Sequence, residues 1–259
     1  MNRLAFKQYG NGHPVVLLHA FPLDNQMWQP QIELASEKLC LILPDLPGFG
    51  ETELSPEEIS IESIAYEVLE LLKHLNIKKA SIGGLSMGGY VTFNLYRIAP
   101  ELFHSILLFD TSPFADTDEK RNARIELIKQ IKTKGVLALV ENMLPNLISE
   151  NTKQKNPVLV SWLKEKFLQT KVTTIEKTLL ALANRKDHSY LLKEIKVPTL
   201  LIFGEHDSVT NLEIANKLYH LIPNSKLFKI PEAGHYSNLE NPIAFNSALK
   251  EFLYENYPG

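Results

Sequence analysis

Three side chains of the types that catalyse acyl transfer each follow a different strand-like stretch of the sequence. Ser86 lies in GGLSMGGY (83–90), Asp207 in LLIFGEHDSVT and His235 in KIPEAGHYSN. A serine hydroxyl is a weak nucleophile at neutral pH and needs an adjacent base, which histidine supplies while a carboxylate orients its ring. Loops at the carboxyl ends of parallel strands meet at one edge of an α/β sheet, where active sites form. The order Ser, Asp, His therefore predicts a nucleophilic triad.

The residues around the serine predict a sharp turn from a strand into a helix. Gly84 to Gly88 fits the pattern G-x-S-x-G, whose central serine is held in a strained backbone conformation. Such a turn lifts the hydroxyl above the edge of the sheet and aims the backbone N–H of Met87 at the same space. That N–H and the positive end of the following helix would stabilise a developing oxyanion.

Six short runs indicate buried strands, because they are almost continuously apolar instead of alternating. They are residues 14–21, 39–46, 78–85, 104–111, 197–207 and 225–235. Helical spacing of apolar residues separates several of them. The expected helix starts are Ser60, Thr210 with Glu213 in a capping box, and Asn241 before Pro242. Strands that alternate with helices predict a mostly parallel, twisted sheet with helices on both faces.

One long segment contains no strand candidate. Residues 112–194 carry four helical patterns, DEKRNARIELIKQIKT, GVLALVENMLPNLI, NPVLVSWLKEKFLQ and VTTIEKTLLALAN. Because this segment falls between two core strands, we expect a core domain of residues 1–111 and 195–259 with an inserted helical cap, or lid, of residues 112–194.

Length, charge and cysteine content limit the kinds of partner and environment that we expect for this protein. The chain has 259 residues, which fits one domain with an insertion, and its net charge of −3 gives no reason to expect a nucleic-acid partner. The single cysteine, Cys40, excludes an intramolecular disulfide. No apolar run approaches the ~18 residues of a membrane span, and the first residues lack an apolar leader, so we expect a cytoplasmic protein.

Cofactor and metal motifs are also missing from the sequence. Gly48-Phe49-Gly50 lacks the third glycine of a dinucleotide-binding turn, and no lysine of a phosphate-binding loop follows GGLSMGG. There is no HExxH and no paired His/Cys spacing suited to zinc. We therefore expect no metal and no cofactor.

Five motifs together resemble those of the α/β-hydrolase superfamily, over residue 4 to the end of the chain. In chain order they are LLHAFPLD, PDLPGFGET, GLSMGG, LLIFGEHD and EAGHYSNLENP. The resemblance implies an α/β-hydrolase fold and a serine-nucleophile member like the esterases and lactonases. It implies that Ser86 is the nucleophile, that His235 acts as base and then acid, and that Asp207 orients the imidazole. The first strand of the family's sheet is expected to be short or missing.

The resemblance also implies an oxyanion hole made by the backbone N–H groups of Phe21 and Met87. His19 would be a structural hydrogen-bonding residue beneath that loop, and Asp45 with residues 48–50 would shape a tight loop at the same edge. Ala20 stands where the family usually has glycine. Its Cβ excludes a positive φ, so we expect an ordinary backbone conformation there.

The acid position has a second candidate. Asp110, in ILLFDTSP, also follows a strand, and some members of the superfamily draw their acid from that strand. We favour Asp207, because GEHD resembles the more common acid position. Asp110 is then expected to cap the turn into the helical segment.

The predicted reaction is cleavage of a small carboxylic ester, lactone or thioester through an acyl-enzyme. The stretch NARIELIKQIKTKGVLALVENML resembles the cap of enol-lactonases of aromatic catabolism and of small carboxylesterases. We expect a small-molecule acyl substrate to bind between cap and core, and the candidate lining residues are Trp28, Phe114, Met143 and Trp162.

Other activities remain open. Cofactor-free perhydrolases and haloperoxidases, C–C bond hydrolases and acyltransferases use the same triad. A non-catalytic, ligand-binding protein of this fold is a further alternative. Haloalkane dehalogenases and epoxide hydrolases carry an aspartate at the elbow, so Ser86 argues against both.

Overall fold

A seven-stranded sheet forms the centre of the computed structural model, which describes residues 4–257. The strand order is β1-β3-β2-β4-β5-β6-β7; β1 is antiparallel to β3 and every other pair is parallel. The strands are β1 Phe6–Tyr9, β2 His13–Leu18, β3 Leu39–Pro44, β4 Ala80–Leu85, β5 Phe103–Phe109, β6 Thr199–Gly204 and β7 Ser225–Ile230. The predicted α/β class is confirmed.

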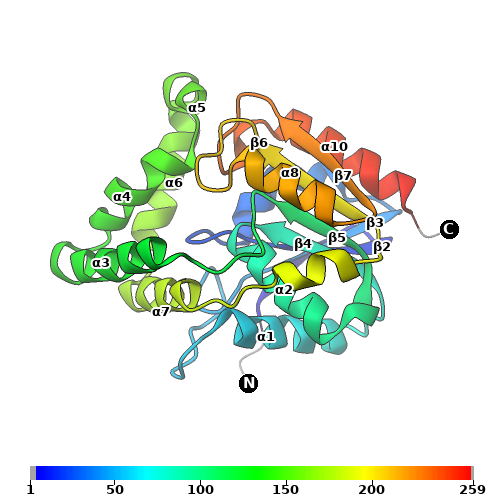
Figure 1. Ribbon diagram of the computed structural model, residues 1–259, viewed down its shortest axis with the longest axis horizontal. Helices are drawn as coiled ribbons and strands as arrows, with labels where there is room; N and C mark the ends of the chain where they lie inside the picture. The colour runs from blue at the N-terminus through cyan, green and yellow to red at the C-terminus, as the bar shows by residue number, and fades with distance from the viewer. Residues whose placement is uncertain (1–3, 258–259) are drawn as a thin grey trace.

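Helices cover both faces of this sheet. α1 and α2 pack on each other and α8 lies along β6 and β7, whereas η1 and α10 contact each other behind the sheet (Figure 1). These helices are η1 Asn25–Leu34, α1 Ile61–His74, α2 Met87–Ile98, η2 Pro100–Leu102, α8 Leu212–Leu221, α9 Ser237–Glu240 and α10 Pro242–Glu255, and η3 Ser189–Glu194 leads into β6.

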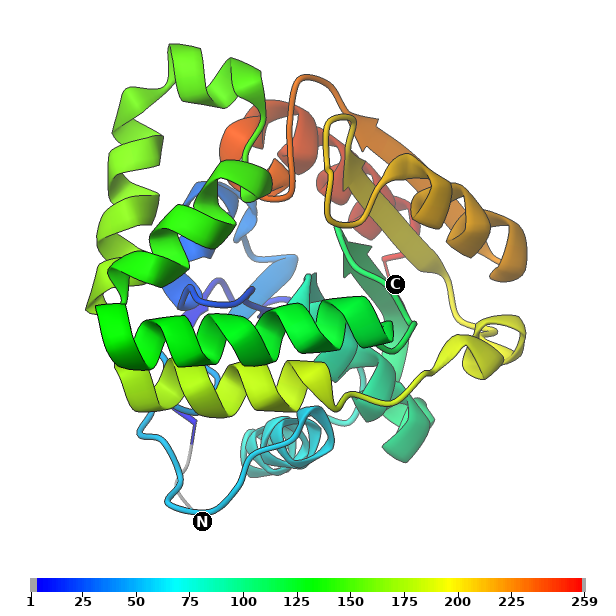
Figure 2. The same cartoon turned by 60° about the vertical axis from the view of Figure 1, so that its left-hand side comes forward.

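Between β5 and β6 the chain forms only helices. They are α3 Asp118–Lys134, α4 Leu137–Leu147, α5 Glu150–Lys155, α6 Pro157–Gln169 and α7 Val172–Ala183, followed by η3. α3 packs on α4 and α7, and α6 packs on α4 and α5. Figures 1 and 2 show these five helices gathered on one side of the sheet. We call α3–α7 the cap helices.

Three of the parallel strands are buried along their whole length, as their nearly continuous apolar sequences predict, and β2 and β5 are buried at most of their residues. All six residues of β3, β4 and β6 are buried. β1 has no apolar run because its two middle residues, Lys7 and Gln8, are exposed at the sheet edge. Among residues 4–257, no helix is both long and apolar enough to cross a membrane.

Two of the three predicted helix starts are correct. The Ser60 side chain accepts a hydrogen bond from the Ser63 N–H at the start of α1, and Asn241 accepts one from Ala244 N–H at the start of α10. The third is wrong by one residue, because Asn211 caps α8 by accepting from Ile214 N–H. The Thr210 hydroxyl is instead engaged at the candidate site.

Candidate active site

Ser86 occupies the strained turn that the sequence predicts. It lies between β4 and α2 with φ +53° and ψ −109°, a region that side-chain-bearing residues rarely adopt. Its N–H donates to Phe109 O at 3.0 Å, and the Thr111 hydroxyl donates to Ser86 O at 2.8 Å. The neighbouring strand thus holds the turn, and Ser86 remains partly exposed between buried neighbours.

Close contact with β2 explains the two glycines of the motif. A Cβ on Gly84 would lie 2.4 Å from Leu18 O, and one on Gly88 would lie 2.1 Å from the same atom. Both distances are far shorter than van der Waals contact. Larger residues would therefore push the serine turn away from the sheet, so G-x-S-x-G is a steric requirement here.

The expected contact between Asp207 and His235 is present. Asp207 Oδ2 lies 2.8 Å from His235 Nδ1, and both side chains are almost completely buried. The Thr210 hydroxyl donates to the same carboxylate oxygen at 2.5 Å. The other oxygen accepts the N–H groups of Val209 at 2.7 Å and Thr210 at 3.0 Å. Thr210 is a functional neighbour that the sequence analysis placed in a helix cap.

These contacts fix the charge of Asp207. Burial alone would raise the pKa of its carboxyl, but the charge and hydrogen bond of His235 and the bonds from Thr210 outweigh it and lower the pKa to about 2. An ionised carboxylate only accepts, so His235 Nδ1 must carry the proton and donate it. With the proton on Nδ1, Nε2 is the ring nitrogen that can accept a proton.

The Asp110 carboxyl does not bond to His235; its partners are Gly204 and Ser237. This fully buried carboxyl accepts Gly204 N–H at 2.8 Å and hydrogen-bonds to the Ser237 hydroxyl. Burial and, second, the negative charge of Asp207 raise the pKa of Asp110 well above its usual value. The expectation that Asp110 caps the turn into the helical segment is wrong, because its side chain ties β6 to the histidine loop.

The loop after β2 has the predicted conformation. Within residues 4–257, Ala20 is not among the side-chain-bearing residues with positive φ, and neither Phe21 N–H nor Met87 N–H donates a hydrogen bond. His19 is fully buried; its Nε2 accepts Leu46 N–H at 2.8 Å, and its Nδ1 lies 3.0 Å from Ala20 O. His19 therefore braces this loop, as the resemblance implies.

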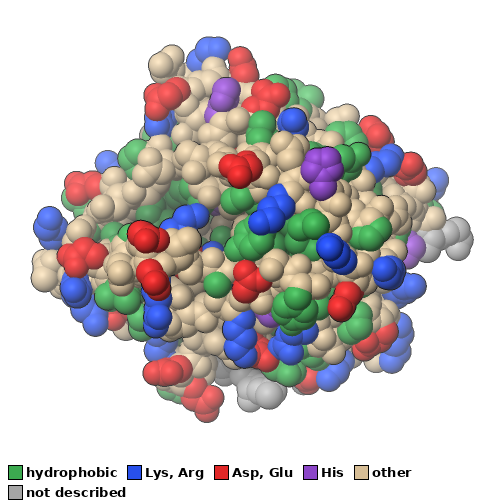
Figure 3. All heavy atoms as spheres, in the orientation of Figure 1, with side chains coloured by type: hydrophobic (Ala, Val, Ile, Leu, Met, Phe, Trp, Pro, Cys, Tyr) green, Lys and Arg blue, Asp and Glu red, His purple; other side chains and the backbone are tan. Residues whose placement is uncertain are grey.

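A cleft of about 620 Å³ opens between α3, α4 and the loops that follow β5 and β6. Three residues in its wall bond to members of the candidate triad. Tyr90 N–H donates to Ser86 O, Leu147 O accepts His235 N–H, and Thr210 bonds to Asp207. Figure 3 shows the hollow on this face, with hydrophobic side chains inside it and both Lys or Arg and Asp or Glu side chains at its margin. Ser86, Asp207 and His235 do not themselves line the hollow. Because residues bonded to them form part of its wall, we call it the triad cleft.

The four predicted lining residues have different surroundings. Met143 lies in the wall of the triad cleft. Trp28 is fully buried and packs against Phe109 and Phe245, so its assignment to the pocket is wrong: the apolar ring serves the core on the η1 side. Phe114 lies under Lys217 Nζ, 4.4 Å from the ring centre, and Trp162 lies beside Lys166. Neither of these two lines the triad cleft.

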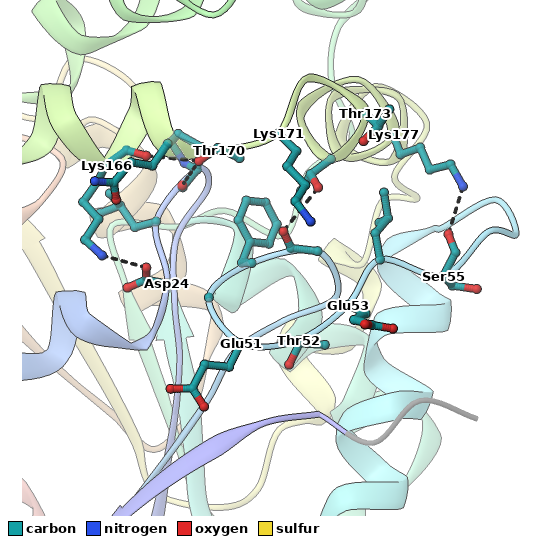
Figure 4. Close-up of a pocket in the computed structure, with 18 of the residues that line it drawn as sticks. Asp24, Glu51, Thr52, Glu53, Ser55, Lys166, Thr170, Lys171, Thr173 and Lys177 are labelled. Atoms are coloured by element: carbon teal, nitrogen blue, oxygen red, sulfur yellow. Dashed lines mark hydrogen bonds and ion pairs between the residues drawn. The ribbon is translucent and has the colours of Figure 1, made fainter.

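A second, slightly larger cleft of about 690 Å³ lies between α6, α7 and the loops that follow β2 and β3, and Pro22, next to Phe21, is part of its wall (Figure 4). Its polar side chains are engaged in contacts between the cap helices and the core. Lys166 pairs with Asp24 at 2.9 Å, and Lys177 Nζ donates to the carbonyls of Ser55, Pro56 and Glu57. These contacts fasten α6 and α7 to the core.

The described residues contain no group of three or more His, Cys, Asp or Glu side chains that would hold a metal ion. The arrangement at the carboxyl edge instead offers a strained hydroxyl, a buried imidazole oriented by a carboxylate, and two unengaged N–H donors. Such a set suits acyl transfer.

Known proteins resemble this chain along almost its whole length. A family model described as the alpha/beta hydrolase fold matches residues 13–242. A malate-bound esterase from Thermogutta terrifontis is 32% identical with a TM-score of 0.94, over 98% of this chain and 94% of that chain. The enol-lactonase from Burkholderia xenovorans LB400 is 26% identical with a TM-score of 0.89, over 97% and 96%. The 3-oxoadipate enol-lactonase 1 of Acinetobacter baylyi is 27% identical over 94% of this chain and 89% of its own length. The chain belongs to the α/β-hydrolase fold family.

Proposed function

We propose that this protein hydrolyses a small carboxylic ester or lactone through an acyl-enzyme formed on Ser86. The observation that carries the proposal is the buried Asp207–His235 pair, with its 2.8 Å contact, together with a serine strained at φ +53° at the same edge of the sheet. The relatives named esterase and enol-lactonase support ester chemistry, and the malate bound to one of them is a small carboxylate ligand.

The first half of the reaction forms the acyl-enzyme. Ser86 Oγ attacks the ester carbonyl while His235 Nε2 takes the hydroxyl proton. The negative charge that develops on the carbonyl oxygen is stabilised by the N–H groups of Phe21 and Met87, which donate no other hydrogen bond within residues 4–257. Collapse of the tetrahedral intermediate breaks the C–O bond, and His235 returns the proton to the leaving alcohol.

The second half repeats these steps with water. His235 takes a proton from water as its oxygen attacks the acyl carbonyl, and the proton then goes to Ser86 as the acid is released. In a lactone the alcohol and acid belong to one molecule, so a single hydroxy acid leaves. Asp207 keeps its charge throughout, consistent with its pKa of about 2, and stabilises the imidazolium that forms twice per cycle.

The cap helices supply selectivity in this proposal. Residues 112–194 contribute Leu127, Met143 and Leu147 to the triad cleft but none of the proposed reacting groups. We treat them as a lid that selects the substrate by shape, with residues 1–111 and 195–259 as the catalytic core. The substrate is a small acyl compound, and a cytoplasmic location stays a prediction.

Turnover of p-nitrophenyl acetate and butyrate, by wild type and by Ser86→Ala, tests the proposal. We expect wild-type turnover and a loss of ~10⁴- to 10⁶-fold in the variant, with unchanged thermal unfolding. Turnover above a tenth of wild type would remove Ser86 from the mechanism. No ester turnover by a well-folded wild type would favour the perhydrolase, C–C hydrolase or non-catalytic alternatives.

A further inference from the structure

One wall of the triad cleft carries more positive than negative charge. Among the residues that line it, Lys120, Arg124 and Arg185 are basic and Asp116 alone is acidic. The Asp116 side chain is completely buried, 2.6 Å from Arg124 Nε and 2.6 Å from Arg185 Nη1. Burial raises the pKa of Asp116, but the hydrogen bond from Arg124 and the two positive charges outweigh it, so the pKa lies below its usual value. One carboxylate therefore faces two guanidinium groups.

Arg185 is held within the protein through Nε and Nη1. Its Nε donates to Phe114 O at 3.1 Å and its Nη1 to Leu182 O at 2.9 Å. The guanidinium also lies over the Tyr90 ring, 4.4 Å from its centre, and the side chain is only 6% exposed. These contacts fix Arg185 as a structural partner of Asp116.

Arg124 is anchored through one nitrogen of its guanidinium, and its other nitrogens have no hydrogen-bond partner among residues 4–257. The anchoring nitrogen is Nε, which donates to Asp116. Its side chain is 20% exposed, which places it between the protein interior and the cleft. A guanidinium anchored through Nε keeps its Nη1–Nη2 edge free, and that planar edge matches the two oxygens of a carboxylate.

We propose that the substrate carries a carboxylate, remote from the ester that is cleaved, which Arg124 binds at the cleft wall. This inference rests on the hydrolytic function proposed above. Leu127, Met143 and Ile214 form an apolar part of the lining that suits a short hydrocarbon chain between the two groups, whereas Asn142, Asn146 and Ser208 are polar. Lys120, on the same helix as Arg124, adds positive charge at the mouth of the cleft. The substrate class is thus a half-ester, or a lactone with a carboxylate side chain.

Two esters of nearly the same shape, one charged and one neutral, test whether a carboxylate on the substrate improves cleavage. Monomethyl adipate and methyl 6-oxoheptanoate differ in one group, a carboxylate against a methyl ketone. We expect wild type to have a higher kcat/KM for monomethyl adipate, measured by acid release in a pH-stat. Arg124→Gln should lower the ratio of the two kcat/KM values by about ten- to a hundredfold. Arg124→Lys, which keeps the charge but loses the planar edge, should lower it less.

Arg121→Gln is the matched control on the same helix. Arg121 is exposed and donates to the Asn184 side chain at 3.0 Å, and it does not line the cleft, so the ratio should stay at the wild-type value. A wild-type preference for the neutral ester would overturn the carboxylate site and leave the hydrolytic function standing, even if Arg124→Gln did not fold. An unchanged ratio in Arg124→Gln would also overturn it. If wild type cleaves neither ester nor a p-nitrophenyl ester, both proposals fail.

Discussion

Asp207→Asn separates the orienting role of the carboxylate from its packing, because the two side chains have nearly the same shape. An asparagine Oδ1 would still accept the N–H groups of Val209 and Thr210. Its amide nitrogen would instead face His235 Nδ1 at the position where Oδ2 lies, 2.8 Å away. A neutral imidazole can accept a hydrogen bond from that amide at Nδ1 only if its proton moves to Nε2. Nε2 can then no longer accept the proton of Ser86.

The contacts of Asp207 allow estimates of its effect on stability at low pH and of its effect on kcat. The pKa of Asp207 is lowered from 3.8 to about 2, and at 1.36 kcal/mol for each unit this corresponds to about 2 kcal/mol in favour of the folded, charged form. Because the folded pKa lies below the unfolded value, this stability is present above about pH 4 and is lost as the pH falls toward 2. The wrong tautomer should cost about 10⁴-fold in kcat, or about 5 kcal/mol of activation free energy.

The assay is kcat for p-nitrophenyl butyrate at pH 7, with the free energy of unfolding followed from pH 6 down to pH 2. Asp207→Asn should lose the contribution of about 2 kcal/mol that Asp207 makes to the acid dependence of stability between pH 4 and pH 2. Asp110→Asn is the matched control: its pKa is raised, so the native group already favours the protonated form that an amide resembles. We expect that control to lose less than about tenfold in kcat.

Two results would refute this reasoning. One is Asp207→Asn retaining more than a tenth of wild-type kcat in the folded state. The other is Asp110→Asn losing about 10⁴-fold while Asp207→Asn does not, which would make Asp110 the acid despite its contacts with Gly204 and Ser237.

Three further predictions follow from the same contacts. Met143→Ala should re-rank the preference for p-nitrophenyl esters of graded chain length by about 10- to 200-fold, whereas Trp162→Ala, outside the triad cleft, should change that ranking much less; equal effects would contradict the assigned cleft. Glu240 accepts from Ser149 N–H at 2.8 Å and the Thr152 hydroxyl at 2.7 Å, so Glu240→Ala should lower the free energy of unfolding in urea by about 1–3 kcal/mol. Exposed Glu232, which accepts a hydrogen bond from the Asn151 side chain at 3.2 Å, provides the control. The free energy of unfolding of Glu232→Ala should stay within about 0.5 kcal/mol of wild type, and an equal loss in both variants would show that the buried contacts of Glu240 contribute no more than an exposed one. Thr210→Val removes the hydroxyl that donates to Asp207 and should lower kcat for p-nitrophenyl butyrate by about tenfold, with Asn211→Ala at the adjacent helix cap as the control; a smaller loss than in the control would show that Thr210 only packs.

The parts of the site predicted from sequence are those in which local geometry leaves one choice. Gly84 and Gly88 sit against Leu18 O so closely that only glycine fits, and that constraint marks the position of Ser86 in the chain. Asp207 and His235 follow strands that are buried or end buried, so the parallel sheet brings their loops to one edge. These are short-range signals that topology then assembles.

The parts that sequence analysis missed depend on long-range packing. Trp28 and Met143 are both large apolar residues, and only the fold decides that one faces the core and the other the cleft. Arg124 lies in a helix rich in charged residues, where nothing local distinguishes it from its exposed neighbour Arg121. Its role emerges because Asp116, eight residues away, is buried against it.

The most direct test of the central claim is to locate the covalent adduct that a fluorophosphonate forms with the folded protein, by mass spectrometry of the digested chain. Attack by an activated serine leaves a phosphonyl group on its oxygen as fluoride departs, so the adduct reports the nucleophile itself. We predict a single adduct on the peptide that contains Ser86, absent from Ser86→Ala and formed much more slowly in His235→Ala. An adduct on another residue, or none on a wild type that turns over esters, would contradict the account.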